Sequence, residues 1–353
     1  MLHRVYDEAF PELAEMIFRL DGKRSFFVVV CALLIAVEIF ACVGISIHAQ
    51  SAEQDWEKAA GDKQQFEVAS VRQNKNGGPS YSNFSLDNGN AYFVINKNDK
   101  QDPNGTLFSA KNQTLIRYII FAYKLSGTQE LALRTDYWEG LKLHVPEWVK
   151  GDRYDIEART PQPATKDQMR LMMQSLLAER FNLQVHMEPR EVPIFALVLS
   201  KPGTLGPQLK PHPASNNCSA TAFPDDSGKG ATPAQSLSAL PIPCGQISRL
   251  PPGAPGAHRF GGRNVTLPML GTSMPAQTGM ATVTRPVVDE TGLTGGYDFW
   301  MDWTPEYTGE ANSVETGGTF REALKNQLGL KLEPTKGPVR VLVIDHVEQP
   351  TAN

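Results

Sequence analysis

The sequence predicts an α+β protein, in which an N-terminal transmembrane helix is followed by two duplicated small α/β-sheet modules. Three observations support this: a long apolar run near the N-terminus, an internal repeat, and apolar residues spaced for helices in some segments and for strands in others. The chain has 353 residues, of which 41% are hydrophobic and 20% charged. A packed core is therefore expected. The net charge of −4 provides no positive field for a nucleic acid.

The apolar run covers residues 25–47 and reads SFFVVVCALLIAVEIFACVGISI, with Glu38 as its only charge. At about 1.5 Å per residue it is long enough to cross a bilayer core. Lys23 and Arg24 precede it, and the positive-inside rule keeps that end in the cytoplasm. Everything after the run is then extracytoplasmic. Two outcomes remain open, cleavage by a signal peptidase after Ala49 or retention of the run as a membrane anchor.

These features divide the chain into six segments. We expect a cytoplasmic leader (1–24), a transmembrane helix or signal peptide (25–47), a polar tether (48–64), a first α+β module (65–201), a Pro/Gly-rich linker (202–262) and a second α+β module (263–353).

The two modules are predicted from blocks that recur in the same order. The matched blocks are KNQTL (111–115) with RNVTL (263–267), GDRYDI (151–156) with GGYDF (295–299), LLAERFNL (176–183) with ALKNQLGL (323–330), and PIFALVL (193–199) with PVRVLVI (338–344). A duplication explains this order. It predicts that the Tyr154 and Tyr297 strands occupy equivalent sheet positions, with at least partly buried rings.

Within each module we expect a helix, a strand, a second helix and two strands. The second helix of the first module carries an apolar stripe at three- and four-residue spacing, formed by Met169, Met172, Met173, Leu176, Leu177 and Phe181. The final strands, 193–199 and 338–344, are nearly continuous apolar runs. Such runs are typical of strands covered on both faces.

Cys218 and Cys244, in the linker, are the only cysteines outside the apolar run. In an oxidising compartment we expect them to form a disulfide, and two free thiols are the alternative. A zinc site would need more ligands than His212 and His258 add nearby. No metal or cofactor site is predicted.

The sequence contains no established catalytic motif. Its one candidate for chemistry is His346, which lies between Asp345 and Glu348 at the end of the last strand. An imidazole beside a carboxylate can bind a metal or move a proton, but such pairs are also common at solvated strand ends. His186 has a similar setting. Four tryptophans, which we expect mainly in the core, offer a binding surface as the alternative: Trp138, Trp148, Trp300 and Trp303.

Several segments resemble a soil-associated family of exported domains of unknown function from acidobacteria. The resemblance covers residues 65–353 and rests on FEVASV, MMQSLLAERFNLQVH, PVVDETGLTGGYDFWMDWTP and LGLKLEPTKGPVRVLVIDHVEQP. In that family the domain occurs alone or behind the membrane helices of a zinc metallopeptidase similar to beta-lactam sensors. The resemblance implies export and identifies no catalytic residue. Each repeat also resembles, at the level of fold, the short N-terminal domain of secretins and TonB-dependent receptors.

Together these observations favour a non-catalytic binding or sensing module of the bacterial cell envelope, extracytoplasmic and held to the membrane by its N-terminal helix. Its partner would be an envelope protein or a small ligand. The alternative is an envelope hydrolase or metal-dependent enzyme that uses carboxylates and His346.

Overall fold

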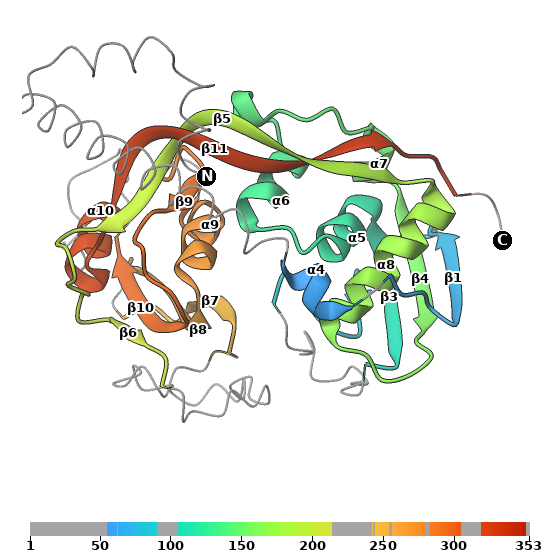
Figure 1. Ribbon diagram of the computed structural model, residues 1–353, viewed down its shortest axis with the longest axis horizontal. Helices are drawn as coiled ribbons and strands as arrows, with labels where there is room; N and C mark the ends of the chain where they lie inside the picture. Colours follow the sequence, from blue (N-terminus) through green and yellow to red (C-terminus); the bar gives the residue numbers. More distant parts are fainter. Residues whose placement is uncertain are drawn as a thin grey trace, which may run out of the picture. The chain divides into compact units, whose positions relative to one another are not determined.

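Figure 1 shows the computed structural model of the chain. The structure describes residues 55–61, 63–89, 105–213, 242, 244–253, 256–279, 282–304 and 319–350. The chain divides into two compact units, Met1–Asp62 and Lys63–Asn353. In the first unit the described residues form one short helix, α4 (Asp55–Ala60), within the segment expected to be a tether. All described sheets belong to the second unit.

The first sheet has four antiparallel strands in the order β1-β4-β3-β2. They are β1 (Val68–Gln73), β2 (Tyr81–Ser82), β3 (Leu107–Thr114) and β4 (Arg153–Arg159). Two helices, α5 (Leu115–Ala122) and α8 (Lys166–Phe181), share one buried core with this sheet. The chain between α5 and β4 forms α6 (Gly127–Arg134), η1 (Glu139–Leu141) and α7 (Glu147–Gly151).

The second sheet also has four antiparallel strands, in the order β6-β10-β8-β7. They are β6 (Leu209–Pro211), β7 (Gln246–Leu250), β8 (His258–Val265) and β10 (Tyr297–Trp303). Helix α9 (Leu267–Thr278) follows β8, and α10 (Phe320–Ala323) continues directly into the π-helical turn η3 (Leu324–Leu328). Strands β6 and β7 and the start of β8 fall inside residues 202–262, the range expected to be a linker.

The two sheets repeat one topology. Each copy has, in chain order, three strands, a helix, a strand and a second helix. In the first copy these are β1, β2, β3, α5, β4 and α8, and in the second they are β6, β7, β8, α9, β10 and α10 with η3. Equivalent strands also take equivalent places in the two sheets. We call residues 68–199 the first copy and residues 209–346 the second copy. Tyr154 on β4 and Tyr297 on β10 lie at equivalent positions, and both are buried. This agrees with the expectation from the sequence repeat.

An irregularity in the sheets is repeated too. Asn112 on β3 and Asn264 on β8 both adopt positive φ, of 54° and 49°. The backbone N–H of Asn112 donates to the carboxylate of Asp155 at 2.7 Å, and that of Asn264 donates to Asp298 at 2.8 Å. Asparagine tolerates this backbone conformation better than most residues. Each Tyr-Asp strand therefore supplies a carboxylate that accepts a bond from the neighbouring bulge.

The third sheet joins the copies. Its order is β11-β5-β9, from β5 (Gln184–Leu199), β9 (Val287–Asp289) and β11 (Leu330–His346). The last strands of the two copies, β5 and β11, run antiparallel side by side along nearly their whole length. The C-terminal part of β5 enters the core of the second copy, and the C-terminal part of β11 enters the core of the first. The two copies have exchanged the ends of their last strands.

Two hydrogen bonds fix the exchanged ends. Beyond β5, the N–H of Ser200 donates to the carbonyl of Gly329 at 2.8 Å, at the end of the second copy's helix. Beyond β11, the N–H of Glu348 donates to the carbonyl of Phe181 at 2.8 Å, at the end of the first copy's helix. Each strand thus ends against the helix of the other copy.

The α+β fold class predicted from the sequence is wrong. The described chain consists mostly of strands in three sheets, with few and short helices. The prediction underestimated the strands because it expected short final strands at 193–199 and 338–344, whereas β5 and β11 run for 16 and 17 residues from one copy into the other. Segment 25–47, expected to span the membrane, lies outside the described residues. Among those that are described, no helix has the length and apolarity needed for a bilayer span.

Candidate functional site

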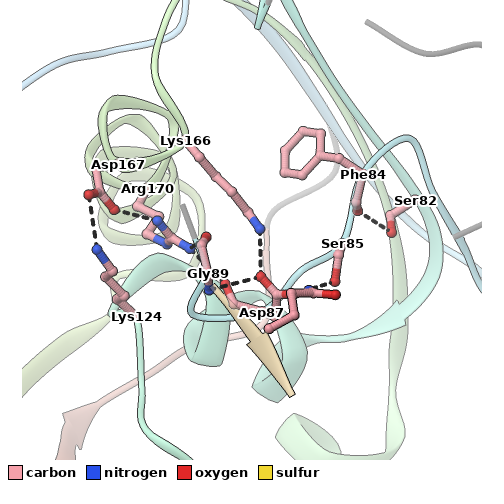
Figure 2. Close-up of polar contacts among 10 residues, drawn as sticks. Ser82, Phe84, Ser85, Asp87, Gly89, Lys124, Lys166, Asp167 and Arg170 are labelled. Atoms are coloured by element: carbon pink, nitrogen blue, oxygen red, sulfur yellow. Dashed lines mark hydrogen bonds and ion pairs between the residues drawn. The ribbon is translucent and has the colours of Figure 1, made fainter. Parts of the chain in front are cut away.

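Figure 2 shows a cluster of charged side chains in the first copy, and one of them contacts the second copy. We call it the Asp87 cluster, and it comprises Asp87, Lys124, Lys166, Asp167 and Arg170. The Asp87 carboxylate is positioned locally, because its oxygens accept bonds from the Ser85 hydroxyl at 2.7 Å and from the Gly89 N–H at 3.0 Å. A short turn therefore presents the carboxylate to helix α8.

Lys166 is the first residue of α8. The helix begins there because Thr165 and Gln168 form a capping box, in which each side chain bonds the backbone N–H of the other residue. The Lys166 ammonium lies 2.6 Å from Asp87 and 5.9 Å from the centre of the Phe84 ring. Its side chain has no exposed surface. Burial lowers the pKa of Lys166 from its ordinary value to about 8, although the neighbouring Asp87 raises it.

Arg170, one turn further along α8, is fully buried. Its guanidinium donates to the carbonyls of Asp87 and Gly89, both at 2.7 Å, and forms an ion pair with Asp167. It also lies 5.3 Å from the centre of the Phe121 ring. Arg170 thus holds the turn that carries Asp87 against α8.

Lys124 closes the other side of the cluster, with its ammonium 2.9 Å from Asp167. Burial lowers the pKa of Lys124, while its hydrogen bond to Asp167 acts in the opposite direction. The cluster therefore brings three cations and two carboxylates together, and both lysines are more easily deprotonated than a lysine in water.

The second copy contributes one polar group to the cluster. The side-chain amide of Gln246, at the start of β7, donates to Asp87 at 2.9 Å. Two further contacts join the copies nearby. The indole N–H of Trp138 donates to the Thr284 carbonyl at 3.2 Å. Helices α6 and α9 approach so closely that a Cβ on Gly127 would overlap the Thr272 carbonyl. Asp87 is therefore part of a tight junction between the copies.

The charged cluster has no counterpart among the residues of the second copy that the structure describes. Helix α8 has 16 residues, whereas the described counterpart runs only from Phe320 to Leu328. When the two helices are matched at their C-terminal ends, where Asn182 and Gly329 both adopt positive φ, the first turns of α8 have no described counterpart. Lys166 and Arg170 lie in those turns.

The sequence contained a signal for this cluster that the sequence analysis missed. Lys166 and Arg170 follow the same three- and four-residue spacing as Met169 and Met173, so they share the apolar face of the helix. A cation on such a face must be paired or must lie at a junction, because an isolated buried charge is costly. Asp87 carried no comparable signal, since acidic residues are common in loops.

The histidines singled out from the sequence form two exposed pairs near the ends of β5 and β11. The His186 ring lies 2.8 Å from Asp345, and the His346 ring lies 2.8 Å from Glu348. The hydrogen bond to His346 lowers the pKa of Glu348, with a second contribution from Asn182. Both histidine side chains are close to half exposed. Exposed pairs of this kind contribute little to stability.

The remaining candidates are dispersed. His212 bonds the buried Asp298 at 2.7 Å, and the His258 ring packs edge-on against Trp303. No group of three or more potential ligands suited to a metal ion occurs in the described part of the chain. Cys244 is disulfide-bonded. Its expected partner, Cys218, lies outside the described residues, so the pairing stays a prediction.

The four tryptophans take different positions. Trp303 is buried in the core of the second copy, and Trp138 is nearly buried at the junction. Trp148 packs against the first core, and Trp300 lies under the Arg259 guanidinium at 4.6 Å. Most of this aromatic surface therefore serves packing.

One family model matches the chain, over residues 117–347, and it describes a protein of unknown function (DUF3738). The chain belongs to this family. The match includes Lys166, Arg170 and the exchanged strands, and it begins after Asp87. No curated protein and no solved structure matches the chain. For this DUF3738 protein, a functional proposal must therefore rest on its own residues.

Proposed function

We propose that the chain is a non-catalytic binding or sensing module of the bacterial cell envelope, located outside the cytoplasm. Its partner would be an envelope protein or a small ligand. The observation that carries the proposal is the position of Asp87, which contacts the buried Lys166 of its own copy and Gln246 of the other.

A buried ionic cluster is a poor way to gain stability, because well-packed apolar residues often do as well or better. Such a cluster can instead favour one relative arrangement of two parts of a protein over the alternative arrangements. The Asp87 cluster lies at the junction of two copies that exchange the ends of their last strands. It is therefore suited to setting the arrangement that a partner recognises, or that a bound ligand changes.

The accessibility of the cluster favours binding over catalysis. A lysine with a pKa of about 8 is chemically suited to act as a base or a nucleophile. In this structure, however, the Lys166 side chain has no exposed surface and its ammonium faces Asp87. A substrate cannot reach it unless the junction opens.

The proposed source and cellular location of the protein rest on its resemblance to the exported acidobacterial domains. We propose an acidobacterial source and export from the cytoplasm on that basis. A C-terminal alkaline phosphatase fusion should then be active, and a cytoplasmic fluorescent reporter at the same position should be dark. The reverse pattern would overturn the extracytoplasmic assignment.

The binding proposal is tested with the tagged full-length chain in its native envelope, by crosslinking and capture. The wild type is compared with Asp87→Asn, which weakens the junction, and with Glu157→Gln, which removes an exposed ion pair to Lys111. We expect a reproducible partner with the wild type and Glu157→Gln, and recovery at least about fivefold lower with Asp87→Asn. That ratio corresponds to roughly 1 kcal/mol of binding free energy. Equal recovery with all three would remove the cluster from the proposal.

The same preparation tests the enzymatic alternative. Turnover of a substrate panel that is abolished by His346→Ala would replace the binding proposal by a hydrolase or metal-dependent enzyme. Turnover that persists in His346→Ala would be attributed to a contaminant.

A further inference from the structure

Two arginines of the second copy share one aromatic ring. The Arg285 guanidinium carbon lies 5.3 Å from the centre of the Phe195 ring, and that of Arg321 lies 4.9 Å from it. Arg285 precedes β9, and Arg321 belongs to α10. The Phe195 ring comes from β5, so three separate elements converge at this point.

Phe195 orients both guanidiniums. The phenylalanine is only 6% exposed, and its N–H is fixed by a 2.8 Å bond to the carbonyl of Pro286, next to Arg285. A guanidinium that stacks on a ring keeps its N–H groups in a plane and directs them away from the ring. The stack therefore orients the guanidinium N–H donors before a ligand binds. The loss of arginine side-chain entropy then occurs on folding and not on binding.

Neither arginine has an ion-pair or hydrogen-bond partner among the residues that the structure describes. The adjacent carboxylate of Glu322 is engaged elsewhere, since it accepts a bond from the Thr319 N–H at 2.9 Å in the capping box of α10. Asp289, at the end of β9, accepts from the Thr291 N–H. The carboxylates of Glu322 and Asp289 thus each accept a hydrogen bond from the backbone.

Two guanidiniums that pack on one ring place two positive charges around a single side chain, which favours an anion that contacts both. Arginine binds carboxylate and phosphate oxygens through two parallel hydrogen bonds, and two arginines suit a ligand with more than one such group.

We propose that Arg285, Phe195 and Arg321 form a binding site for a small polyanion that carries carboxylate or phosphate groups. The site contains no residue of the Asp87 cluster, and it names a ligand class that the proposed module function does not. Because the Asp87 cluster is not involved, Asp87→Asn is expected to leave binding here unchanged. The two proposals can therefore fail separately.

The test uses the full chain and two probes, citrate for carboxylates and pyrophosphate for phosphates, in titration calorimetry at low ionic strength. We expect saturable binding of at least one probe, and about tenfold weaker binding for both Arg285→Gln and Arg321→Gln. Added salt should weaken it further. Binding of citrate alone assigns the site to carboxylates, and binding of pyrophosphate alone assigns it to phosphates.

The matched control is Lys325→Gln, which makes the same charge change at an exposed position of the same helical segment. It should bind the probe as the wild type does. If a glutamine variant fails to fold, judged by its thermal transition, Arg321→Lys keeps the charge and removes the paired donors, and it should still bind several-fold more weakly. No saturable binding, or an equal loss in Lys325→Gln, overturns the proposal.

Discussion

Leu197 and Leu342 occupy each other's half of the molecule. Leu197 lies on β5 of the first copy but is buried in the core of the second. Leu342 lies on β11 of the second copy but is buried in the core of the first. Both are almost completely inaccessible to solvent. The two copies are therefore one folding unit, because each core is incomplete without a strand from the other.

This exchange predicts that a substitution in one copy loosens the other. Leu197→Ala should reduce amide protection mainly in β8 and β10, and Leu342→Ala should reduce it mainly in β3 and α5. Each should cost about 2–5 kcal/mol of unfolding free energy, as for other buried leucines. Hydrogen exchange read by mass spectrometry distinguishes the two patterns. Loss of protection confined to the copy that carries the substitution would contradict the exchange.

The equivalent tyrosines, Tyr154 and Tyr297, are predicted to respond differently when their hydroxyl groups are removed. The Tyr154 hydroxyl is buried and has no hydrogen-bond partner in the described part of the chain, whereas that of Tyr297 donates to the Thr294 carbonyl at 3.2 Å. Tyr154→Phe should therefore leave stability unchanged or raise it slightly, and Tyr297→Phe should cost about 1 kcal/mol. Urea denaturation measures both.

Alanine at the same positions provides the contrast. Either ring leaves a cavity when it is removed, so each Ala variant should cost roughly 3–5 kcal/mol. Near-wild-type stability of both Ala variants would place these rings outside the core.

We predict that Lys166 makes the free energy of unfolding depend on pH in the alkaline range. Its pKa falls from an ordinary 10.5 to about 8 on folding, chiefly through burial. Between these values the unfolded chain binds the proton and the folded chain does not, so the contribution of Lys166 to stability rises with pH in this window. Below about pH 8 both states are protonated, and the cost of burying the charge is fully present.

The measurement is the urea midpoint from pH 7.5 to 9.5, compared between the wild type and Lys166→Met. The free energy of unfolding of the wild type minus that of Lys166→Met should rise as pH rises through this window. The window ends at pH 9.5 so that tyrosine ionisation does not contribute. Burial raises the pKa of Tyr154 to about 12, so ionisation of tyrosine in the unfolded chain near pH 10 would lower the free energy of unfolding. A difference that does not change with pH would mean that Lys166 keeps an ordinary pKa.

The Cys218–Cys244 disulfide is predicted from the sequence and is directly measurable. It would close a loop of roughly 27 residues, for which the chain-entropy model gives about 3–4 kcal/mol. Because Cys244 immediately precedes β7, reduction should act mainly on the edge of the second sheet and on the Gln246 contact to Asp87. Intact mass with thiol labelling before reduction decides the matter, and two labelled thiols would disprove the bond.

The sequence by itself determined the duplication, because repeated blocks such as KNQTL and RNVTL carry local signals: an asparagine at a bulge, a helix start, an apolar strand. It also determined where the Tyr-Asp strands lie, since each copy repeats the same pattern of buried residues. These features depend on a few neighbouring residues, and short-range physical chemistry is enough to recognise them.

Only the tertiary structure decided which core each strand completes and where the charges meet. An apolar strand such as 193–199 requires burial on both faces but does not specify the copy that supplies it. Asp87 meets Lys166 across 79 positions of sequence and Gln246 across 159. Arg285 and Arg321 reach Phe195 from separate elements. Such contacts arise from the packing of whole strands and helices, and no local pattern in the sequence encodes them.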